Sequence, residues 1–381
     1  MTVKHPATGR GHALALALAV AMSAQSAWAN PYYDPTKPHH TPTGFRNTYS
    51  GAVHKPVGDL LRWKWEALLA GVPKPPQAPI PVVAPDLALI TGYRRTAAAA
   101  DAMSPPALTW IGHATTLVQA NGLNVLTDPM FSERAAPVQI VGPQRAQPPG
   151  VALDDLPPID VVIISHNHYD HLDRASVAAL DLMAKGQGRG TLFLVPLGLK
   201  PWLATLGITN VVELDWWQQH TVQGVEFHLT PVQHWSARGL GDQSETLWGG
   251  WAVLGPNLHW YFGGDAAYSQ DLADTRARLA SRQGGAQGGG FDLALLPIGG
   301  YEPRWFMRAQ HMNPKEALQA HHDLAARHSV GIHWGTFTLT DEALDQPPLD
   351  LAAAKLADGL KDEAFVVMKI GQTLLWPMRR P

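Results

Sequence analysis

The chain has 381 residues, of which 45% are hydrophobic and 16% charged, so it can bury a large core and its composition is that of a folded rather than a disordered protein. Its formal net charge of -3 shows no basic excess, which argues against a nucleic-acid partner. It contains no cysteine, which excludes disulfide bonds, thiolate metal sites and cysteine nucleophiles, so any transition-metal site must use the 18 histidines and the carboxylates.

Residues 1–29 are typical of a secretory signal peptide. Lys4 and Arg10 form a positive start, and the apolar run that follows is shorter than the roughly 20 residues that span a bilayer. Ala27 and Ala29 provide the small side chains of a cleavage site. We therefore expect export to the bacterial periplasm or outer envelope, with cleavage after Ala29. An uncleaved anchor or an N-terminal core helix is the alternative.

Residues 30–106 predict an N-terminal arm, a helix and a connector. The arm, residues 30–56, is rich in Pro, Tyr and Thr and has no clear periodicity. Residues 72–85 carry six prolines, which rules out a regular helix and indicates a stiff connector. Between them, residues 59–70 predict a helix with apolar side chains roughly on one side: Leu60, Leu61, Trp65, Leu68 and Leu69.

From Ala107 onward the pattern changes to that of strands, and residues 107–381 are expected to form the catalytic domain. Two apolar segments flank Asn121-Gly122, a dipeptide that favours a tight β-hairpin. Residues 159–165 (IDVVIIS) form a continuous β-branched run, which suits a strand covered on both faces. Further strands are expected at 191–196, 211–214, 225–230, 247–254, 258–263, 292–297, 329–333 and 364–368.

Helices are expected between these strands, notably at residues 173–184 and 314–327. Asn313-Pro314 is a suitable start for the second helix, because Asn caps a helix and Pro fits its first turn. The glycine-rich segment 284–290 is predicted to be a mobile surface loop. Many strands with interspersed helices indicate a layered α/β architecture, although the order of elements alone does not say which one.

Four metal-binding side chains lie within six residues, at His166, His168, Asp170 and His171. They directly follow the apolar strand that ends at Ser165, where the chain turns and alternate side chains can converge. Four such groups do not fit one tetrahedral zinc comfortably, but they can serve two adjacent metals, two groups to each. The alternative is a polar loop that is histidine-rich by chance. The compact spacing after a buried strand favours the metal site.

The H-x-H-x-D-H pattern after a hydrophobic strand resembles the signature of the metallo-β-lactamase superfamily, which implies an αββα sandwich. Longer strings narrow the resemblance to N-acylphosphatidylethanolamine-hydrolysing phospholipase D and its bacterial relatives, over roughly residues 45–370. These strings include WIGHATTLV, LTDPMFSERAAP, LPPIDVVIISHNHYDHLD, IGGYEPRWFM and IHWGTF.

The resemblance implies three further metal ligands, each of which follows a predicted strand. They are His234 (QHWS), the bridging carboxylate Asp265 (GGDAAY) and His333 (IHWGTF). One zinc is then expected on His166, His168 and His234, and a second on Asp170, His171 and His333, with Asp265 between them. Such a pair of zinc ions is expected to activate water and to stabilise the transition state of phosphoryl transfer. Asp170 and Asp265 are thus expected to be catalytic.

Other residues carry weaker expectations. Asp128 (LTDP) is similar to a family carboxylate near the metals and is expected to orient a ligand histidine; the alternative is a turn cap. Gln310 and His311 match a family position facing the substrate, with a polar pair at a helix entry as the alternative. Tyr169 and Arg174 are expected to contact the head group, although Arg174 departs from the tyrosine of the animal enzyme.

The resemblance implies a two-zinc phospholipase D that hydrolyses N-acylphosphatidylethanolamine to N-acylethanolamine and phosphatidic acid. A hydrolase of a lactone or a smaller phosphodiester would have the same fold and metal site. A redox di-iron enzyme is disfavoured, because such sites usually place a carboxylate where this chain has His168. A non-catalytic envelope lipid-binding protein is disfavoured by the complete ligand set. A phospholipid substrate implies transient membrane contact, for which helix 59–70 is the candidate; the alternative is a helix that only covers the domain.

Overall fold

The computed structural model describes residues 29–51, 53, 55–93, 104–239, 241–284 and 289–379. The predicted signal peptide therefore lies outside the described residues except for Ala29, and so does most of the glycine-rich segment 284–290. Within the described part of the chain, no helix is both long enough and apolar enough to cross a membrane.

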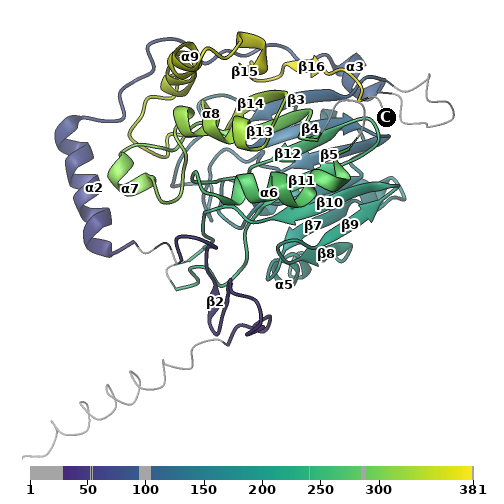
Figure 1. The fold of residues 1–381 in the computed structure, drawn as a ribbon, viewed down its shortest axis with the longest axis horizontal. Coiled ribbons are helices and arrows are strands. Elements are labelled where there is room, and N and C mark those ends of the chain that lie inside the picture. The colour runs from purple at the N-terminus through teal and green to yellow at the C-terminus, as the bar shows by residue number, and fades with distance from the viewer. Residues whose placement is uncertain are drawn as a thin grey trace, which may run out of the picture.

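Two seven-stranded sheets form the centre of the molecule (Figure 1). The first sheet has the order β16 (Thr373–Leu375), β3 (Ala107–Gly112), β4 (Thr115–Ala120), β5 (Leu123–Thr127), β6 (Val161–Ile163), β7 (Leu192–Pro196) and β8 (Val211–Leu214). The second has the order β15 (Phe365–Val367), β14 (His328–Ile332), β13 (Leu293–Pro297), β12 (His259–Phe262), β11 (Gly250–Leu254), β10 (Val225–Thr230) and β9 (Gln219–Val222).

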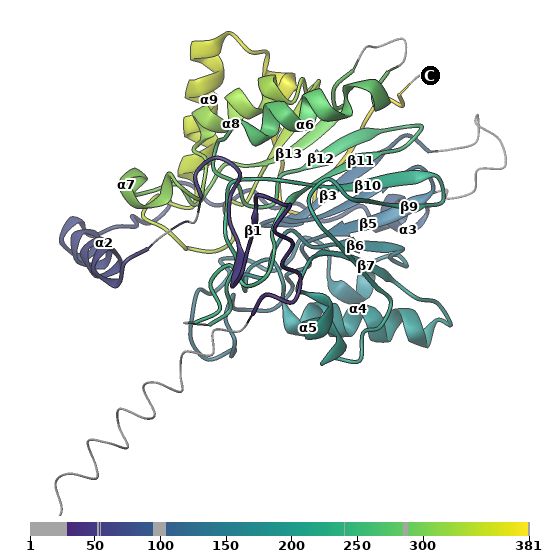
Figure 2. The same ribbon diagram turned by 60° about the horizontal axis from the view of Figure 1, so that its bottom comes forward.

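Helices cover the outer face of each sheet, which gives the expected αββα sandwich (Figure 2). The first sheet is covered by α4 (Arg174–Gly186) and α5 (Lys200–Ala204), and the second by α6 (Asp271–Leu279), α8 (Pro314–Asp323) and α9 (Gln346–Asp358). The remaining elements are α2 (Val57–Ala70), α3 (Leu87–Thr91), α7 (Arg304–Met307), the short strands β1 (His40–Thr41) and β2 (Gly44–Phe45), and 3-10 turns at Leu153–Asp155, Ala280–Arg282 and Asp362–Ala364.

The central strand β6 shows why a continuous apolar run suits this fold. It is paired in parallel with β5 and β7, and its side chains alternate between the two faces of the sheet. Val161 and Ile163 join the core shared with the second sheet, whereas Val162 joins the smaller core beneath α4. Because both faces are buried, every position of the strand must be apolar.

Local sequence signals correctly place several turns and helix ends. Asn121 and Gly122 connect β4 to β5 and both have positive φ, at 54° and 78°, as a tight hairpin turn requires. Asn313 caps α8 in a reciprocal capping box with Glu316. The helix ends at Asp323 rather than 327, because Ala325 adopts a left-handed conformation with φ 47°.

Other boundaries differ from the sequence expectation for reasons of tertiary structure. The strand expected at 247–254 begins at Gly250, because Leu247 N donates to Leu197 O and Gly249 N donates to Ser165 O in neighbouring loops. The sequence analysis did not predict strands β9 and β16 or helix α9. Helix α9 has prolines at Pro347 and Pro348, which are compatible with a first helical turn but usually signal a loop.

The N-terminal arm and the connector are bound to the sandwich. Asp215, just after β8, accepts hydrogen bonds from Lys37 Nζ at 2.6 Å, His39 Nε2 at 2.7 Å and His40 Nε2 at 3.0 Å. The proline-rich connector is held by backbone bonds in both directions with Ile370, at 2.9 and 3.0 Å. These contacts fix segments that have little regular structure of their own.

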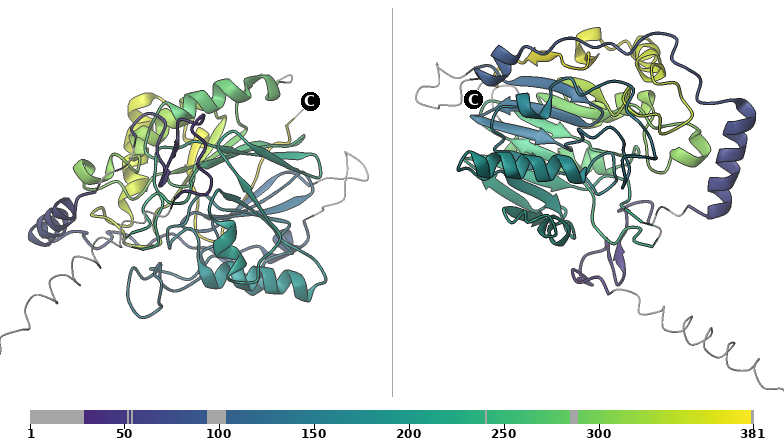
Figure 3. Two further views of the ribbon diagram at one scale, coloured as in Figure 1. Left: turned by 90° about the horizontal axis from the view of Figure 1, so that it is seen from below. Right: turned by 180° about the vertical axis from the view of Figure 1, so that it is seen from behind.

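Helix α2 lies at the periphery and packs through a narrow face (Figures 1 and 3). Trp63 and Ala67 are buried against Phe306 and Met307 of α7, and Trp63 Nε1 donates to Asp341 Oδ1 at 2.9 Å. The apolar face predicted from the sequence does not pack on the domain, because its members are 42–71% exposed: Leu60, Leu61, Trp65, Leu68 and Leu69.

Candidate metal centre

The expected ligands converge at one edge of the sandwich, where strands of both sheets end. The loop after β6 carries His166–His171, while β10, β12 and β14 are followed by His234, Asp265 and His333. Strands β10, β12 and β14 run in the same direction, so their carboxyl ends meet at one edge. The fold therefore brings together seven residues, of which His166 and His333 are 167 positions apart in the sequence.

A first group of ring nitrogens surrounds one point. His166 Nε2 lies 2.8 Å from His168 Nδ1, and His234 Nε2 lies 3.4 Å from the same His168 atom. Asp265 Oδ2 is 3.9 Å from His166 Nε2 and 3.7 Å from His234 Nε2. Three imidazoles and one carboxylate at these separations form a donor set suited to zinc.

A second group lies beside the first and shares Asp265 with it. His171 Nε2 is 3.4 Å from Asp170 Oδ2 and 3.2 Å from Asp265 Oδ2. His333 Nε2 is 3.5 Å from Asp170 Oδ2 and 3.0 Å from Asp265 Oδ1. Asp265 Oδ2 thus lies near rings of both groups and Oδ1 lies near His333, a position that suits a carboxylate between two metals.

Hydrogen bonds behind the rings fix which nitrogen faces the centre. His171 Nδ1 donates to Asp128 Oδ2 at 2.7 Å, so its Nε2 faces inward. His166 Nδ1 contacts Ser165 Oγ at 2.8 Å, and Ser165 Oγ donates to Asp128 at 2.6 Å. Asp128 therefore contacts His171 directly and His166 through Ser165, a position from which a carboxylate can orient ligand rings.

His234 is held from a different part of the chain. Its Nδ1 donates to the backbone carbonyl of Gln310 at 2.8 Å, which leaves Nε2 free to face His166 and His168. Asn47 of the N-terminal arm holds the backbone of His234 in both directions, because its side chain donates to His234 O and accepts from His234 N, both at 2.9 Å. Sequence reasoning did not identify Asn47.

The buried polar atoms of the centre fit a bound cation. His171 Nε2, His333 Nε2 and Asp265 Oδ1 are buried and make no hydrogen bond, although a buried polar atom ordinarily has a partner. His333 Nε2 lies 3.0 Å from Asp265 Oδ1, and His171 Nε2 lies 3.2 Å from the other oxygen of Asp265. A metal ion is the partner that satisfies lone pairs of imidazole and carboxylate together.

Burial and charge set the ionisation of the cluster. Burial lowers the pKa of His168 to about 4 and that of His234 to about 3, so both rings are neutral at pH 7, as metal binding requires. Burial alone would also lower the pKa of His171, but the carboxylates of Asp265 and Asp170 outweigh it and raise the pKa well above the usual value. Negative charge is therefore concentrated at the second group, where it favours a cation.

His113, which the sequence analysis did not single out, also belongs to the cluster. It follows β3 at the same edge, and its Nε2 donates to Asp170 Oδ2 at 2.9 Å. Burial lowers its pKa to about 3, so the neutral ring positions the Asp170 carboxylate without adding charge. The sequence feature that could have identified His113 is its position at the end of a strand, inside the string WIGHATTLV.

The expected substrate-contacting residues lie in different places. His311 is in the centre, with Nδ1 3.9 Å from Asp265 Oδ2, and it is partly exposed together with His168 and Asp170, which marks the open side. The side chain of Gln310 is buried and contacts Met307, while its backbone holds His234.

Within the described part of the chain, the side chains of Tyr169 and Arg174 make no hydrogen bond or ion pair with the cluster, and their roles stay predictions. Tyr169 OH donates to Arg238 O at 2.8 Å, and Arg174 is an exposed residue at the first position of α4. Arg238, which the sequence analysis overlooked, lies over the Tyr169 ring at 4.1 Å. It donates to Asn167 O and Leu172 O and so supports the metal-binding loop.

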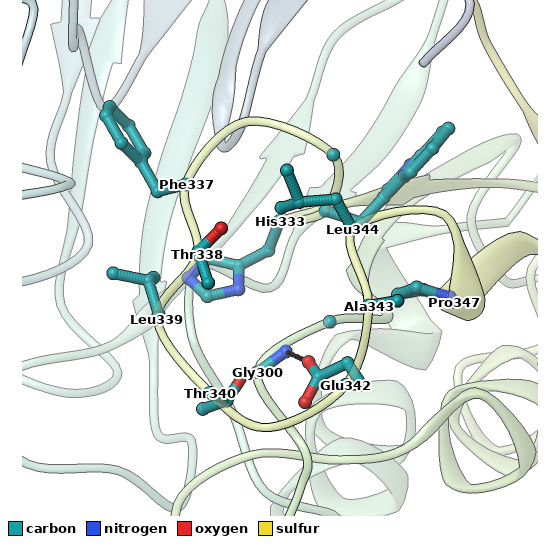
Figure 4. Close-up of a pocket in the computed structure, with 13 residues that line it drawn as sticks. Gly300, His333, Phe337, Thr338, Leu339, Thr340, Glu342, Ala343, Leu344 and Pro347 are labelled. Atoms are coloured by element: carbon teal, nitrogen blue, oxygen red, sulfur yellow. Dashed lines mark hydrogen bonds between the residues drawn. The ribbon is translucent and has the colours of Figure 1, made fainter. Parts of the chain in front are cut away.

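His333 and the loop that follows it line one pocket together with Gly299 and Gly300 (Figure 4). Gly300 lies against the His333 ring with φ 81°, a conformation that favours glycine. A Cβ atom at this position would lie 3.2 Å from His311 Nδ1 and 3.3 Å from His333 Cε1. Position 300 must therefore be glycine, both for its backbone and for the space that the two histidines need.

Comparisons with known proteins agree with this geometry. A family described as "Beta-lactamase superfamily domain" matches residues 123–334. The chain is 39% identical to N-acyl-phosphatidylethanolamine-hydrolyzing phospholipase D 1 of Caenorhabditis elegans over 69% of this chain and 74% of the relative. It is 41% identical to an uncharacterised protein of Mycobacterium tuberculosis over 76% of this chain and 72% of that one. An isothiocyanate hydrolase from Delia radicum gut bacteria has the same fold, with 21% identity, a TM-score of 0.54, and coverage of 71% and 99%.

Replacing Gly300 by alanine is expected to disturb His333 specifically. Gly359 is a matched control, since it has φ 77° but no atom within 4 Å of an added Cβ. Gly359→Ala is expected to cost about 1 kcal/mol of unfolding free energy, and Gly300→Ala about 2–4 kcal/mol because crowding adds to the same backbone strain. Urea unfolding and metal analysis measure both effects. Equal destabilisation with equal bound metal would contradict this account of Gly300.

Proposed function

Because the chain belongs to the N-acylphosphatidylethanolamine-hydrolysing phospholipase D family of the metallo-β-lactamase superfamily, we propose that it hydrolyses N-acylphosphatidylethanolamine to N-acylethanolamine and phosphatidic acid, with two zinc ions per chain. The protein is a metal-dependent hydrolase. The observation that carries the finer proposal is the pair of donor groups that share Asp265, in a chain related to a phospholipase D along most of its length.

Each of the two zinc ions would have its own set of ligand residues. His166, His168 and His234 would hold one zinc, and Asp170, His171 and His333 the other, with Asp265 between them. When bound, the pair of zinc ions supplies a water of lowered pKa and stabilises negative charge on a phosphate.

The protein's own residues orient these groups and set the direction of access. Asp128 and Ser165 hold the rings of His171 and His166 from behind. The partly exposed His168, Asp170 and His311 leave one side for the phosphate diester to approach.

Membrane contact through α2 belongs to the same proposal, since the substrate is a bilayer lipid. The exposed apolar face of the helix includes Leu61 at 65%, Trp65 at 62% and Leu68 at 71%. Lys64 is exposed on the same helix and suits the anionic surface of a bilayer, whereas Arg62 is paired with Glu66 at 2.7 Å. A helix that only covered the domain would place its apolar residues against the domain, whereas α2 turns them outward.

Export is likewise proposed. The segment described by the structure includes Asn30, which is buried and donates from its side chain to Gly44 O at 2.8 Å. Asn30 would be the first residue of the mature chain after the expected cleavage.

The metal assignment predicts about two zinc ions per purified chain. Asp265→Ala is expected to lose both metal and activity, because two cations would then face each other without the carboxylate between them. Metal analysis and turnover measure the two effects together. His322→Ala is the control, since His322 is exposed and its contacts, with Asp358 and with the ring of His321, lie outside the metal centre. Full activity in wild-type protein that carries no metal would refute the assignment.

The phospholipase assignment predicts which bond breaks. Attack of water on phosphorus forms one P–O bond and breaks the P–O bond to the N-acylethanolamine, which leaves with a proton. Hydrolysis in ¹⁸O-water is therefore expected to label phosphatidic acid and to leave N-acylethanolamine unlabelled, as mass spectrometry can show. Rapid opening of a lactone without phosphatidic acid formation would favour the other hydrolase instead.

The membrane proposal predicts a loss of vesicle binding when the α2 face is made polar. Leu61→Ser combined with Leu68→Ser is expected to weaken binding to vesicles containing anionic phospholipid by at least about tenfold, since each leucine buries apolar area in the interface. Leu356→Ser on α9 is the control, because Leu356 is 85% exposed on a different helix. A cosedimentation assay in which all variants bind alike would exclude α2 as the contact.

The export proposal predicts a mature chain that begins at Asn30. Cleavage after Ala29 leaves this N-terminus, and intact-mass measurement of protein from the periplasmic fraction is expected to show it. A full-length species confined to the cytoplasm would contradict it.

A further inference from the structure

A cavity of about 580 Å³ lies between the N-terminal arm and the sandwich, apart from the metal-binding loops. The arm contributes Lys37 and Arg46 to its lining, the turn after β8 contributes Trp216 and Trp217, and α6 contributes Arg278. This volume is within the range of about 300–1,000 Å³ that is typical of small-molecule sites. It is also much larger than an inorganic anion requires.

The charges around this cavity are of one sign. Lys37, Arg46 and Arg278 line it, and no Asp or Glu does so within the described part of the chain. Lys37 is paired with Asp215, whereas the side chain of Arg46 donates to a backbone carbonyl among the described residues, Pro38 O at 2.7 Å. Two guanidinium groups thus remain available for an oxyanion, and guanidinium geometry suits phosphate.

The aromatic side of the cavity is held in an unusual conformation. Trp217 has φ 71°, which is rare for a bulky side chain and marks a position that the surrounding structure enforces. Its backbone N–H donates to Leu229 O at 2.7 Å, and the Arg278 guanidinium lies 4.6 Å from its ring centre. This arrangement places a cation and an apolar ring side by side at the same wall.

We infer that this cavity binds a phosphate monoester carried on an apolar body. The doubly negative phosphate would lie between Arg46 and Arg278, and the apolar part would lie along Trp216 and Trp217. Phosphatidic acid has this chemistry. The identification of phosphatidic acid as the natural occupant rests on the function proposed above, because phosphatidic acid is the product of that reaction. The chemistry of the cavity does not depend on that function.

Asn47 connects the cavity to the metal centre. It lines the cavity, and the same side chain makes both hydrogen bonds to the backbone of His234. An occupant that orders residues 46–48 would therefore also restrain His234. The site is thus placed to regulate the centre without contacting it.

The test titrates full-length, metal-containing protein with dihexanoylphosphatidic acid in a calorimeter. Arg46→Gln combined with Arg278→Gln is expected to weaken binding at least about tenfold, since each arginine provides charge-assisted hydrogen bonds. Arg282→Gln combined with Lys361→Gln is the control, because both residues are exposed and lie outside the cavity. Replacing them removes the same net charge as the double variant in the cavity. Dihexanoylphosphatidic acid that binds at the metal centre would do so in both double variants, so it does not affect the comparison. Equal affinity of the two variants would overturn the inference.

Two further arms define the ligand class. Inorganic phosphate and dihexanoylglycerol, which lack the apolar body and the phosphate respectively, are each expected to bind at least about tenfold more weakly. Inorganic phosphate binding as tightly as the lipid would overturn the inference, since the aromatic wall would then contribute nothing.

Hydrogen–deuterium exchange locates the bound lipid. Dihexanoylphosphatidic acid is expected to protect residues 36–51 in the wild-type protein and not in the arginine double variant. Protection confined to the metal-binding loop 166–172 would overturn the inference. Binding at the cavity by a protein that does not hydrolyse N-acylphosphatidylethanolamine would refute the proposed function and leave this site intact.

Discussion

The candidate metal centre depends on hydrogen bonds that hold its buried imidazole rings. Each bond is made by the ring nitrogen that faces away from the metal. A ring with two nitrogens can face a metal with only one of them, and the other selects the tautomer by its hydrogen bond. Asp128 provides this bond to His171 and, through Ser165, to His166. The carbonyl of Gln310 provides it to His234. Because an unpaired buried polar group costs about 1–3 kcal/mol, these outer bonds stabilise the arrangement as well as orient it.

The sandwich architecture makes such a centre available at one edge. The first sheet delivers His166–His171 and His113, and the second delivers His234, Asp265 and His333. Asp265 lies close to rings from both sheets, so the centre also joins the two layers. The large apolar core between the sheets holds them in a fixed position relative to each other. This core includes side chains as bulky as Trp110. Each donor group combines residues from both sheets, so a shift between the sheets would disrupt both groups.

The segments before the sandwich have defined contacts rather than serving as loose extensions. Asp215 anchors the arm through three donors, and this position lets Asn47 hold the backbone of His234. Helix α2 is attached by Trp63 and turns its larger apolar face to solvent. Buried apolar area explains the attachment of the helix but not its exposed face, and a surface of this kind is usually an interaction site.

The sequence by itself determined the features whose physical cause is local. Four metal-binding groups within residues 166–171 indicated a metal site, because neighbours in a strand-end turn are close in any fold. Asn121-Gly122 fixed a hairpin and Asn313 a helix start through backbone preferences of single residues. The distant ligands His234 and His333 were reached through the family resemblance, since spacing alone does not select them among 18 histidines.

Tertiary structure alone decided the features that depend on which strand ends meet. His113 and Asn47 reach the centre through sheet order and through the docking of the arm, neither of which a linear pattern encodes. For α2, the sequence left open whether the apolar face contacts a membrane or covers the domain, and tertiary structure turned this face to solvent. Its apolar periodicity predicts a helix with a buried stripe, but the surface that meets the domain is chosen by the shape of the neighbouring α7. Local sequence constrains the backbone within a few residues, whereas side chains far apart in the sequence meet only as the completed packing of the sheets allows.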